Sequence, residues 1–217
     1  MKIQAVDIGR TASAASIIFD ALRKAIIEGD LKDGEPLRQD ELAKMFNTSR
    51  IPVREALTRL EQHGLVRTVR YKGAVVAGLS ADEAAEIFDF RALLEGEVIA
   101  RAVPLMTPSI LAEARGYCDA FHDSGDPMEW GDLNRKFHAT LYAAANLPYH
   151  MKVINSAMDQ IDRYLRAQLL LSKGMERANK EHLAILAACE AGESEKARRL
   201  TQQHILGAKA SLIDHLK

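Results

Sequence analysis

Three histidines in the C-terminal half of the chain have the type and spacing needed to bind a metal ion. His138 lies one helical turn after Asn134, so both residues face the same side of a predicted helix. His182 begins the apolar stripe of a second predicted helix, and His204 stands among small residues that leave space for an imidazole. A single histidine of this kind is more often a hydrogen-bonded core residue, but three on inward-facing stripes exceed what burial requires. Imidazole nitrogens suit zinc, nickel, cobalt and manganese, so the pattern predicts a site for a divalent transition metal, with zinc as the first candidate.

Arg91 is a charged residue on an otherwise apolar helical stripe. Its neighbours on that stripe are Ile87, Leu94 and Val98. A buried guanidinium needs a partner, and two are open to it. One is Glu95, four residues later, in an ion pair within the helix; the other is the carboxylate of a small effector bound beside the metal. Gln168, on the apolar stripe of a later helix, is a second polar candidate for effector binding.

A second group of residues, near the N-terminus, could read DNA. Four residues of the segment 49–63 form one buried helix face, namely Val53, Ala56, Leu57 and Leu60. Arg54 points away from that face and Arg50 lies at its margin. Such arginines can donate two hydrogen bonds to guanine in the major groove, or hold phosphates. Arg70 and Lys72, at the tip of a predicted hairpin, could reach a neighbouring backbone or minor groove. The alternative is a solvated charged helix face beside an ordinary hairpin.

The elements that must position these residues fall into two parts. Residues 12–28, 39–46 and 49–63 show helical spacing of apolar residues, and 65–69 and 74–77 follow with a period of two. This order predicts a winged helix–turn–helix domain over residues 1–78. Residues 79–217, after a short linker, are predicted to be an all-α effector-binding and dimerisation domain. Prolines and glycines divide it into six helices, at about 80–103, 108–123, 127–145, 149–172, 175–191 and 193–215. The fold class is therefore mainly α, with one small β-hairpin and a C-terminal six-helix bundle.

The composition is that of a globular protein with one large or two small domains. Of 217 residues, 47% are hydrophobic and 27% charged, and the formal net charge is −1. The first 78 residues have a modest basic excess, which fits a nucleic-acid-binding module joined to an acidic remainder. No segment has the roughly 18 apolar residues that a membrane span requires, and the N-terminus lacks the apolar core of a secretory signal. Two widely separated cysteines are too few for a disulfide scaffold, so we expect a cytoplasmic protein.

Three segments within about residues 15–79 carry a family pattern: LRKAIIEGDLKDGEPL, ELAKMFNTSRIPVREALTRLEQHGLV and RYKGAVV. Within the second, SRIPVREALTRLEQHGLV is highly specific. They closely resemble the GntR family of bacterial transcription regulators. The resemblance implies that operator DNA is contacted by Ser49, Arg50 and Arg54 of the recognition helix, supported by Arg70 and Lys72 of the wing. The sequence departs from the family at Asn47, where glycine is usual. Asparagine tolerates the left-handed conformation, so we expect the turn to be kept.

The helical remainder carries further motifs in a fixed order: FRALLEGEVIARAV at 90–103, LNRKFHATLYAAAN at 133–146, KEHLAILAACEAGE at 180–193, and a last helix that contains His204. The ordered set resembles the FCD effector domain of the FadR-type branch of the GntR family, and six helices suit its shorter, VanR-like variant. The resemblance implies that His138, His182 and His204 bind the metal. It places Asn134 at the fourth ligand position, where these domains usually have aspartate. A neutral amide oxygen is a weaker ligand than a carboxylate.

Together these features predict a metabolite-responsive bacterial transcription regulator. We expect a homodimer that binds palindromic double-stranded operator DNA, because the two-fold axis of the protein then matches that of the DNA. A small organic acid bound beside the metal would change the spacing of the two DNA-binding heads. Two other functions stay open. One is a metal-dependent enzyme built on the three histidines, for which no evident general base is found. The other is a DNA-binding regulator whose pocket is degenerate at Asn134.

Overall fold

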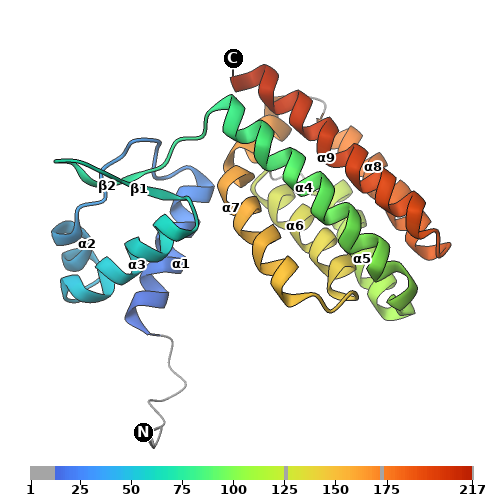
Figure 1. Cartoon of the computed structure of the whole chain (residues 1–217), viewed down its shortest axis with the longest axis horizontal. Coiled ribbons are helices and arrows are strands. Elements are labelled where there is room, and N and C mark those ends of the chain that lie inside the picture. Colours follow the sequence, from blue (N-terminus) through green and yellow to red (C-terminus); the bar gives the residue numbers. More distant parts are fainter. Residues whose placement is uncertain (1–12, 125–126, 172–173, 217) are drawn as a thin grey trace, which may run out of the picture. The chain divides into compact units, whose positions relative to one another are not determined.

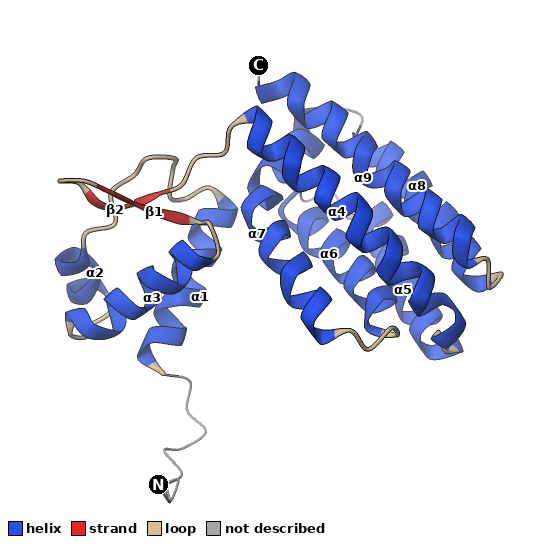
Figure 2. Ribbon diagram, in the orientation of Figure 1, coloured by secondary structure: helices blue, strands red, loops and turns tan. Residues whose placement is uncertain are grey.

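The computed structural model describes residues 13–124, 127–171 and 174–216, and they divide into two compact units. One unit ends at Ala77 and the other begins at Gly78. Figure 2 shows that the first unit combines helices with a two-stranded hairpin, whereas the second is helical. The mainly α fold class predicted from the sequence is confirmed.

The first unit is a winged helix–turn–helix. Its elements are α1 (Ala14–Glu28), α2 (Gln39–Met45), α3 (Arg50–Gln62), β1 (Val66–Val69) and β2 (Gly73–Val76). The two strands pair antiparallel, with Val66 opposite Val76 and Val69 opposite Gly73. Helix α1 begins where the Ser13 side chain accepts a hydrogen bond from the Ser16 amide, and it ends at Gly29 in the left-handed conformation.

Helix α3 is held in this unit by its apolar face. The four residues expected to point inward, Val53, Ala56, Leu57 and Leu60, are all buried, and they join α1 and both strands in one core. Asn47, in the turn between α2 and α3, has a φ of 47°, so the turn is kept with asparagine in the left-handed region, as expected. The opposite face of α3 is therefore left to the solvent in a fixed orientation.

The second unit contains six α-helices in the part of the chain that the structure describes. They are α4 (Ala81–Ala102), α5 (Pro108–Asp123), α6 (Pro127–Ala143), α7 (Pro148–Leu171), α8 (Gly174–Glu190) and α9 (Ser194–Leu216), with a short 3₁₀ turn, η1 (Val103–Leu105), after α4. Each lies within about two residues of its predicted range, which is the usual uncertainty of helix ends.

Helices α4 and α9 lie side by side along most of their length (Figure 1). Gly96 is buried where they meet, and a Cβ atom there would lie 2.8 Å from Cγ of Gln202 on α9. Helix α4 starts with the predicted capping box, in which Ser80 and Glu83 satisfy each other's backbone amides. Arg91 and Glu95 lie on this helix with their side chains buried in the interior of the bundle.

Candidate metal centre and DNA-binding surface

Three helices bring three imidazoles together inside the bundle. His138 comes from α6, His182 from α8 and His204 from α9, and all three side chains are buried. One ring nitrogen from each residue lies within 4.8 Å of the corresponding nitrogens of the other two. Burial of three histidines in one cluster removes them from water, so their nitrogens must find partners inside the protein.

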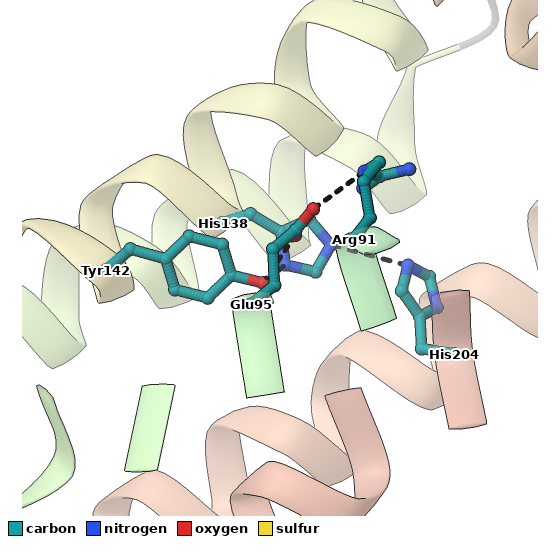
Figure 3. Close-up of polar contacts among 5 residues, drawn as sticks. All are labelled: Arg91, Glu95, His138, Tyr142 and His204. Atoms are coloured by element: carbon teal, nitrogen blue, oxygen red, sulfur yellow. Dashed lines mark hydrogen bonds and ion pairs between the residues drawn. The ribbon is translucent and has the colours of Figure 1, made fainter. Parts of the chain in front are cut away.

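Hydrogen bonds on the outer side fix which nitrogen of two imidazoles faces the cluster. Nδ1 of His204 lies 2.7 Å from Oε2 of Glu181, and a carboxylate can only accept, so Nδ1 carries the proton. Nδ1 of His138 lies 3.2 Å from the Tyr142 hydroxyl, which donates its own hydrogen to Oε2 of Glu95 at 2.9 Å. The hydroxyl oxygen therefore accepts from His138. When both rings are neutral, Nε2 of each is therefore left with its lone pair; Figure 3 shows the Tyr142 contact of His138 and the approach of His138 to His204.

The two free lone pairs face each other across a distance that suits a metal ion. The Nε2 atoms of His138 and His204 are 3.3 Å apart. Two neutral imidazoles with both protons on Nδ1 cannot hydrogen bond to each other through Nε2. Two nitrogens bound to one tetrahedral zinc at about 2.0–2.1 Å are separated by about 3.4 Å. The residues present therefore fit a divalent cation between the rings.

His182 provides the third nitrogen and is the least satisfied of the three. Its ring packs against Phe137 at a centroid distance of 4.6 Å and against Phe121 at 5.2 Å. Neither ring nitrogen has a hydrogen-bond partner among the described residues. A buried orphaned polar group is costly, and a bound cation would satisfy one of these nitrogens.

Burial keeps the cluster in the form that binds metals. Desolvation lowers the pKa of His138 well below its usual value, and the neighbouring His182 and His204 lower it further. Desolvation, followed by the effect of His204, lowers the pKa of His182 in the same way. Neutral imidazole is the metal-binding form, so no proton has to leave these two rings at neutral pH.

Arg91 and Glu95 form a buried ion pair next to the histidines. Nε of Arg91 donates to Oε1 of Glu95 at 2.6 Å, and the two side chains are only 5% and 1% exposed. The structure thus contains the ion pair that was one of the two possibilities for Arg91. The same arginine lines a narrow cavity between α4, α6 and α7, with room for roughly one water molecule. Arg135, Met151, Asn155 and Met158 also line it.

The other two polar candidates are placed differently. Asn134 lies on α6, one turn before His138, and is half-buried. Gln168 lies on α7, but its side chain falls outside the described part of the structure. Arg135, adjacent to Asn134, is 22% exposed and pairs with Asp159 at 2.8 Å.

The predicted recognition residues lie on the solvent face of the winged unit. Ser49 is the residue before α3, and Arg50 and Arg54 project from its first turns, all three exposed. Arg50 pairs with Asp40 of α2, which steadies one guanidinium at the start of the helix. Ser49, Arg50 and Asp40 also border a shallow open groove at the helix–turn–helix turn.

The hairpin tip presents a small basic and aromatic group. Arg70 and Lys72 are exposed, and Tyr71 between them is 90% exposed with a φ of 66°. The Arg70 guanidinium lies 4.8 Å from the centre of the Tyr71 ring. A cation–π contact of this kind attracts the guanidinium to the face of the exposed ring.

Comparison with protein-family models matches both units. The model described as bacterial regulatory proteins, gntR family, matches residues 14–76, and the FCD domain model matches residues 86–207. The chain is a GntR-family transcriptional regulator with an FCD domain. The resemblance seen in the sequence is confirmed.

Related regulators share this arrangement along most of the chain. The HTH-type transcriptional repressor GlaR of Escherichia coli is 30% identical over 198 residues, which is 85% of this regulator and 89% of GlaR. The gluconate operon transcriptional repressor of Bacillus subtilis is 30% identical over 159 residues, 71% of this regulator and 64% of the relative. The solved structure of Escherichia coli McbR/YncC shares the fold, with a TM-score of 0.81 and 24% identity over 95% of this chain and all of that one.

The structure also adds site residues that sequence inspection missed in this GntR regulator. The sequence offered no evident general base for the histidines. In the structure Glu181 contacts His204 directly, and Glu95, expected only as a partner of Arg91, reaches His138 through the Tyr142 hydroxyl. Each already accepts a hydrogen bond, from His204 and Tyr142 respectively, so each positions a neighbouring ring. The spacing of Tyr142, four residues after His138, was the available signal for the contact between those two residues. Among the described residues, no helix is long and apolar enough to cross a membrane.

Proposed function

We propose that this regulator binds operator DNA as a homodimer and that its FCD domain senses a small carboxylate with the help of a bound divalent metal. The observation that carries the proposal is the convergence of three buried imidazoles, two with their lone pairs turned inward, beside a cavity lined by Arg91. The relatives named as repressors support a role in transcription. An enzyme is not favoured, because the nearby carboxylates are engaged in orienting the rings.

In the proposed DNA complex, α3 enters the major groove. Arg54 would donate to base edges, since its side chain is exposed on the face opposite the core. Ser49 and Arg50 stand at the start of the same helix, and Arg70 and Lys72 on the wing would hold neighbouring phosphates. Dimeric binding would place one recognition helix in each half of a palindromic site.

In the proposed metal site, His138, His182 and His204 supply nitrogens and Asn134 an amide oxygen. A bound divalent cation, with zinc the first candidate and nickel, cobalt or manganese as others, would supply positive charge beside a carboxylate bound at Arg91. Glu181 and Tyr142 hold two of the rings in the orientation that binding requires. The remaining positive charge for the effector comes from Arg91.

The proposed effector is a small organic acid that binds Arg91 through its carboxylate, and the cavity must widen from its present volume of about one water molecule to admit it. Glu95 uses only Nε of that arginine, and the two terminal NH₂ groups have no hydrogen-bond partner among the described residues. These two groups form the end of the guanidinium fork that matches a carboxylate. The Bacillus subtilis relative is named for the operon of gluconate, which is itself a carboxylate.

Two measurements on the full-length protein test the proposal. Reconstitution with zinc at neutral pH, followed by elemental analysis, is expected to find about one metal per chain and a melting temperature that rises with free zinc. In gel shifts with operator DNA, Arg54→Ala is expected to lose about 1–3 kcal/mol per half-site, while Arg101→Ala on α4 should bind like wild type. A protein that takes up no metal, or an Arg54→Ala variant with wild-type affinity, would contradict the corresponding half of the proposal.

A further inference from the structure

A continuous chain of side-chain contacts links the arginine of the cavity to the histidine cluster. It runs from Arg91 to Glu95 (2.6 Å), from Glu95 to the Tyr142 hydroxyl (2.9 Å) and from that hydroxyl to Nδ1 of His138 (3.2 Å), as Figure 3 shows. Its four members are buried, so water does not compete for these hydrogen bonds. Two helices supply them, Arg91 and Glu95 from α4 and Tyr142 and His138 from α6.

Each link in this chain is directional. The two oxygens of Glu95 have separate partners, because Oε1 accepts from Arg91 and Oε2 accepts from Tyr142. The Tyr142 hydroxyl donates a hydrogen bond to Glu95, and its oxygen accepts one from Nδ1 of His138. The strength with which Glu95 attracts the tyrosine hydrogen therefore affects how strongly His138 is polarised toward its free Nε2.

We infer that Glu95 and Tyr142 are positioning residues that couple carboxylate binding at Arg91 to metal binding at His138. A carboxylate on the two terminal NH₂ groups of Arg91 shares the positive charge that otherwise acts on Glu95 alone. Glu95 then pulls harder on the Tyr142 hydrogen, and His138 becomes a stronger metal ligand. By reciprocity, bound metal increases the affinity for the carboxylate by the same factor. This inference rests on the proposed metal and effector sites.

The alternative source of coupling is direct contact, in which the carboxylate binds the metal and needs no protein side chain between them. Coupling through side chains depends on the Tyr142 hydroxyl, whereas coupling by direct contact does not. Tyr142→Phe keeps the buried ring, Arg91 and His138 but removes the link between Glu95 and His138. Tyr164→Phe is the matched control, because the Tyr164 hydroxyl, in the same bundle, accepts from the Leu79 amide at 2.9 Å.

The test measures cobalt(II) affinity by competition with a chromophoric chelator, using full-length protein with and without acetate or succinate. In wild type and Tyr164→Phe, the carboxylate is expected to tighten cobalt binding about tenfold. In Tyr142→Phe, cobalt affinity without carboxylate should fall about tenfold, which is the usual cost of losing such an outer partner. The carboxylate effect should shrink toward no change, and the visible cobalt spectrum should shift, while circular dichroism shows an intact fold.

Three results would overturn the inference. The first is a Tyr142→Phe variant that keeps the wild-type carboxylate effect. The second is a wild-type protein whose cobalt affinity is the same with and without either carboxylate. The third is a Tyr164→Phe variant that loses as much cobalt affinity and carboxylate effect as Tyr142→Phe. A wild-type protein that binds no cobalt would instead refute the proposed metal site itself. Glu95→Gln gives a second reading, because it keeps the shape but removes the charge, and it should reduce the carboxylate effect in the same direction.

Discussion

Replacement of His182 by leucine is expected to stabilise the metal-free protein. The side chain is fully buried, and neither ring nitrogen has a hydrogen-bond partner among the described residues. Leucine has a similar volume and no polar atoms, so it removes the orphaned groups without opening a large cavity. A histidine that lowers the stability of the metal-free protein in this way is expected where metal binding requires its nitrogen.

The size of the effect follows from two opposing contributions. Removal of two orphaned buried polar groups gains about 2–6 kcal/mol, at about 1–3 kcal/mol each. Loss of the ring contacts with Phe121 and Phe137 costs about 1–3 kcal/mol, at about 0.5–1.5 kcal/mol for each aromatic pair. The midpoints of these two ranges, about 4 and about 2 kcal/mol, leave a net gain of about 2 kcal/mol. For a domain of this size, 2 kcal/mol corresponds to a rise of about 4–8 °C in melting temperature.

Thermal unfolding in the presence of a chelator, and again with excess zinc, measures both sides of this balance. His182→Leu should melt above wild type in the chelator, whereas zinc should raise the melting temperature of wild type and leave the variant unchanged. His138→Leu is the contrasting variant, because Nδ1 of His138 donates to the Tyr142 hydroxyl and its loss removes that hydrogen bond. A His182→Leu variant that is less stable than wild type without metal would refute the reasoning.

Three further predictions concern pH, the fourth ligand and the wing. Without metal, the free energy of unfolding should be constant above about pH 6.5. Below that pH it should fall by up to about 1.4 kcal/mol per pH unit for each of His138 and His182, because the unfolded chain binds protons that the buried rings refuse. Urea unfolding between pH 5 and pH 8 measures this, and an unchanged midpoint would contradict it. Asn134→Asp should tighten zinc binding in a chelator competition, because a carboxylate replaces a neutral amide; equal or weaker binding would remove Asn134 from the site. Lys72→Ala should weaken binding to operator and unrelated DNA alike and flatten the salt dependence by about one phosphate contact; a loss confined to the operator would instead indicate base reading.

Much of the architecture could be predicted from the sequence because its signals are local. The helical repeats, the glycine and proline breaks and the capping box at Ser80 depend on residues a few positions apart, and the helices lie close to their expected ranges. The inward position of His138 and His204 followed from the same periodicity. For a mainly helical chain, these short-range patterns determine which residues face the core.

The side-chain contacts between different helices could not be predicted from such short-range patterns. Glu181 is next to His182 in the sequence, yet its carboxylate accepts from His204 on the neighbouring helix. Tyr142 has the pattern of an apolar core residue, and its contact with Glu95 depends on how α4 packs against α6. For Arg91, spacing identified Glu95 as a possible partner but could not show that only Nε is used.

The capped start of α4 has a mechanical consequence. Ser80 and Glu83 close the first turn with reciprocal hydrogen bonds of 3.2 and 3.0 Å, so the helix does not fray where the chain enters it from the winged unit. Arg91 stands ten residues after Ala81, about 15 Å further along the axis. A tilt of a few degrees pivoting at Arg91 would move the first residue of α4 by about 1 Å. An uncapped first turn would unwind and absorb that displacement. A capped first turn would move as a rigid body with the rest of α4 and would shift the end of the segment that leads to the winged unit.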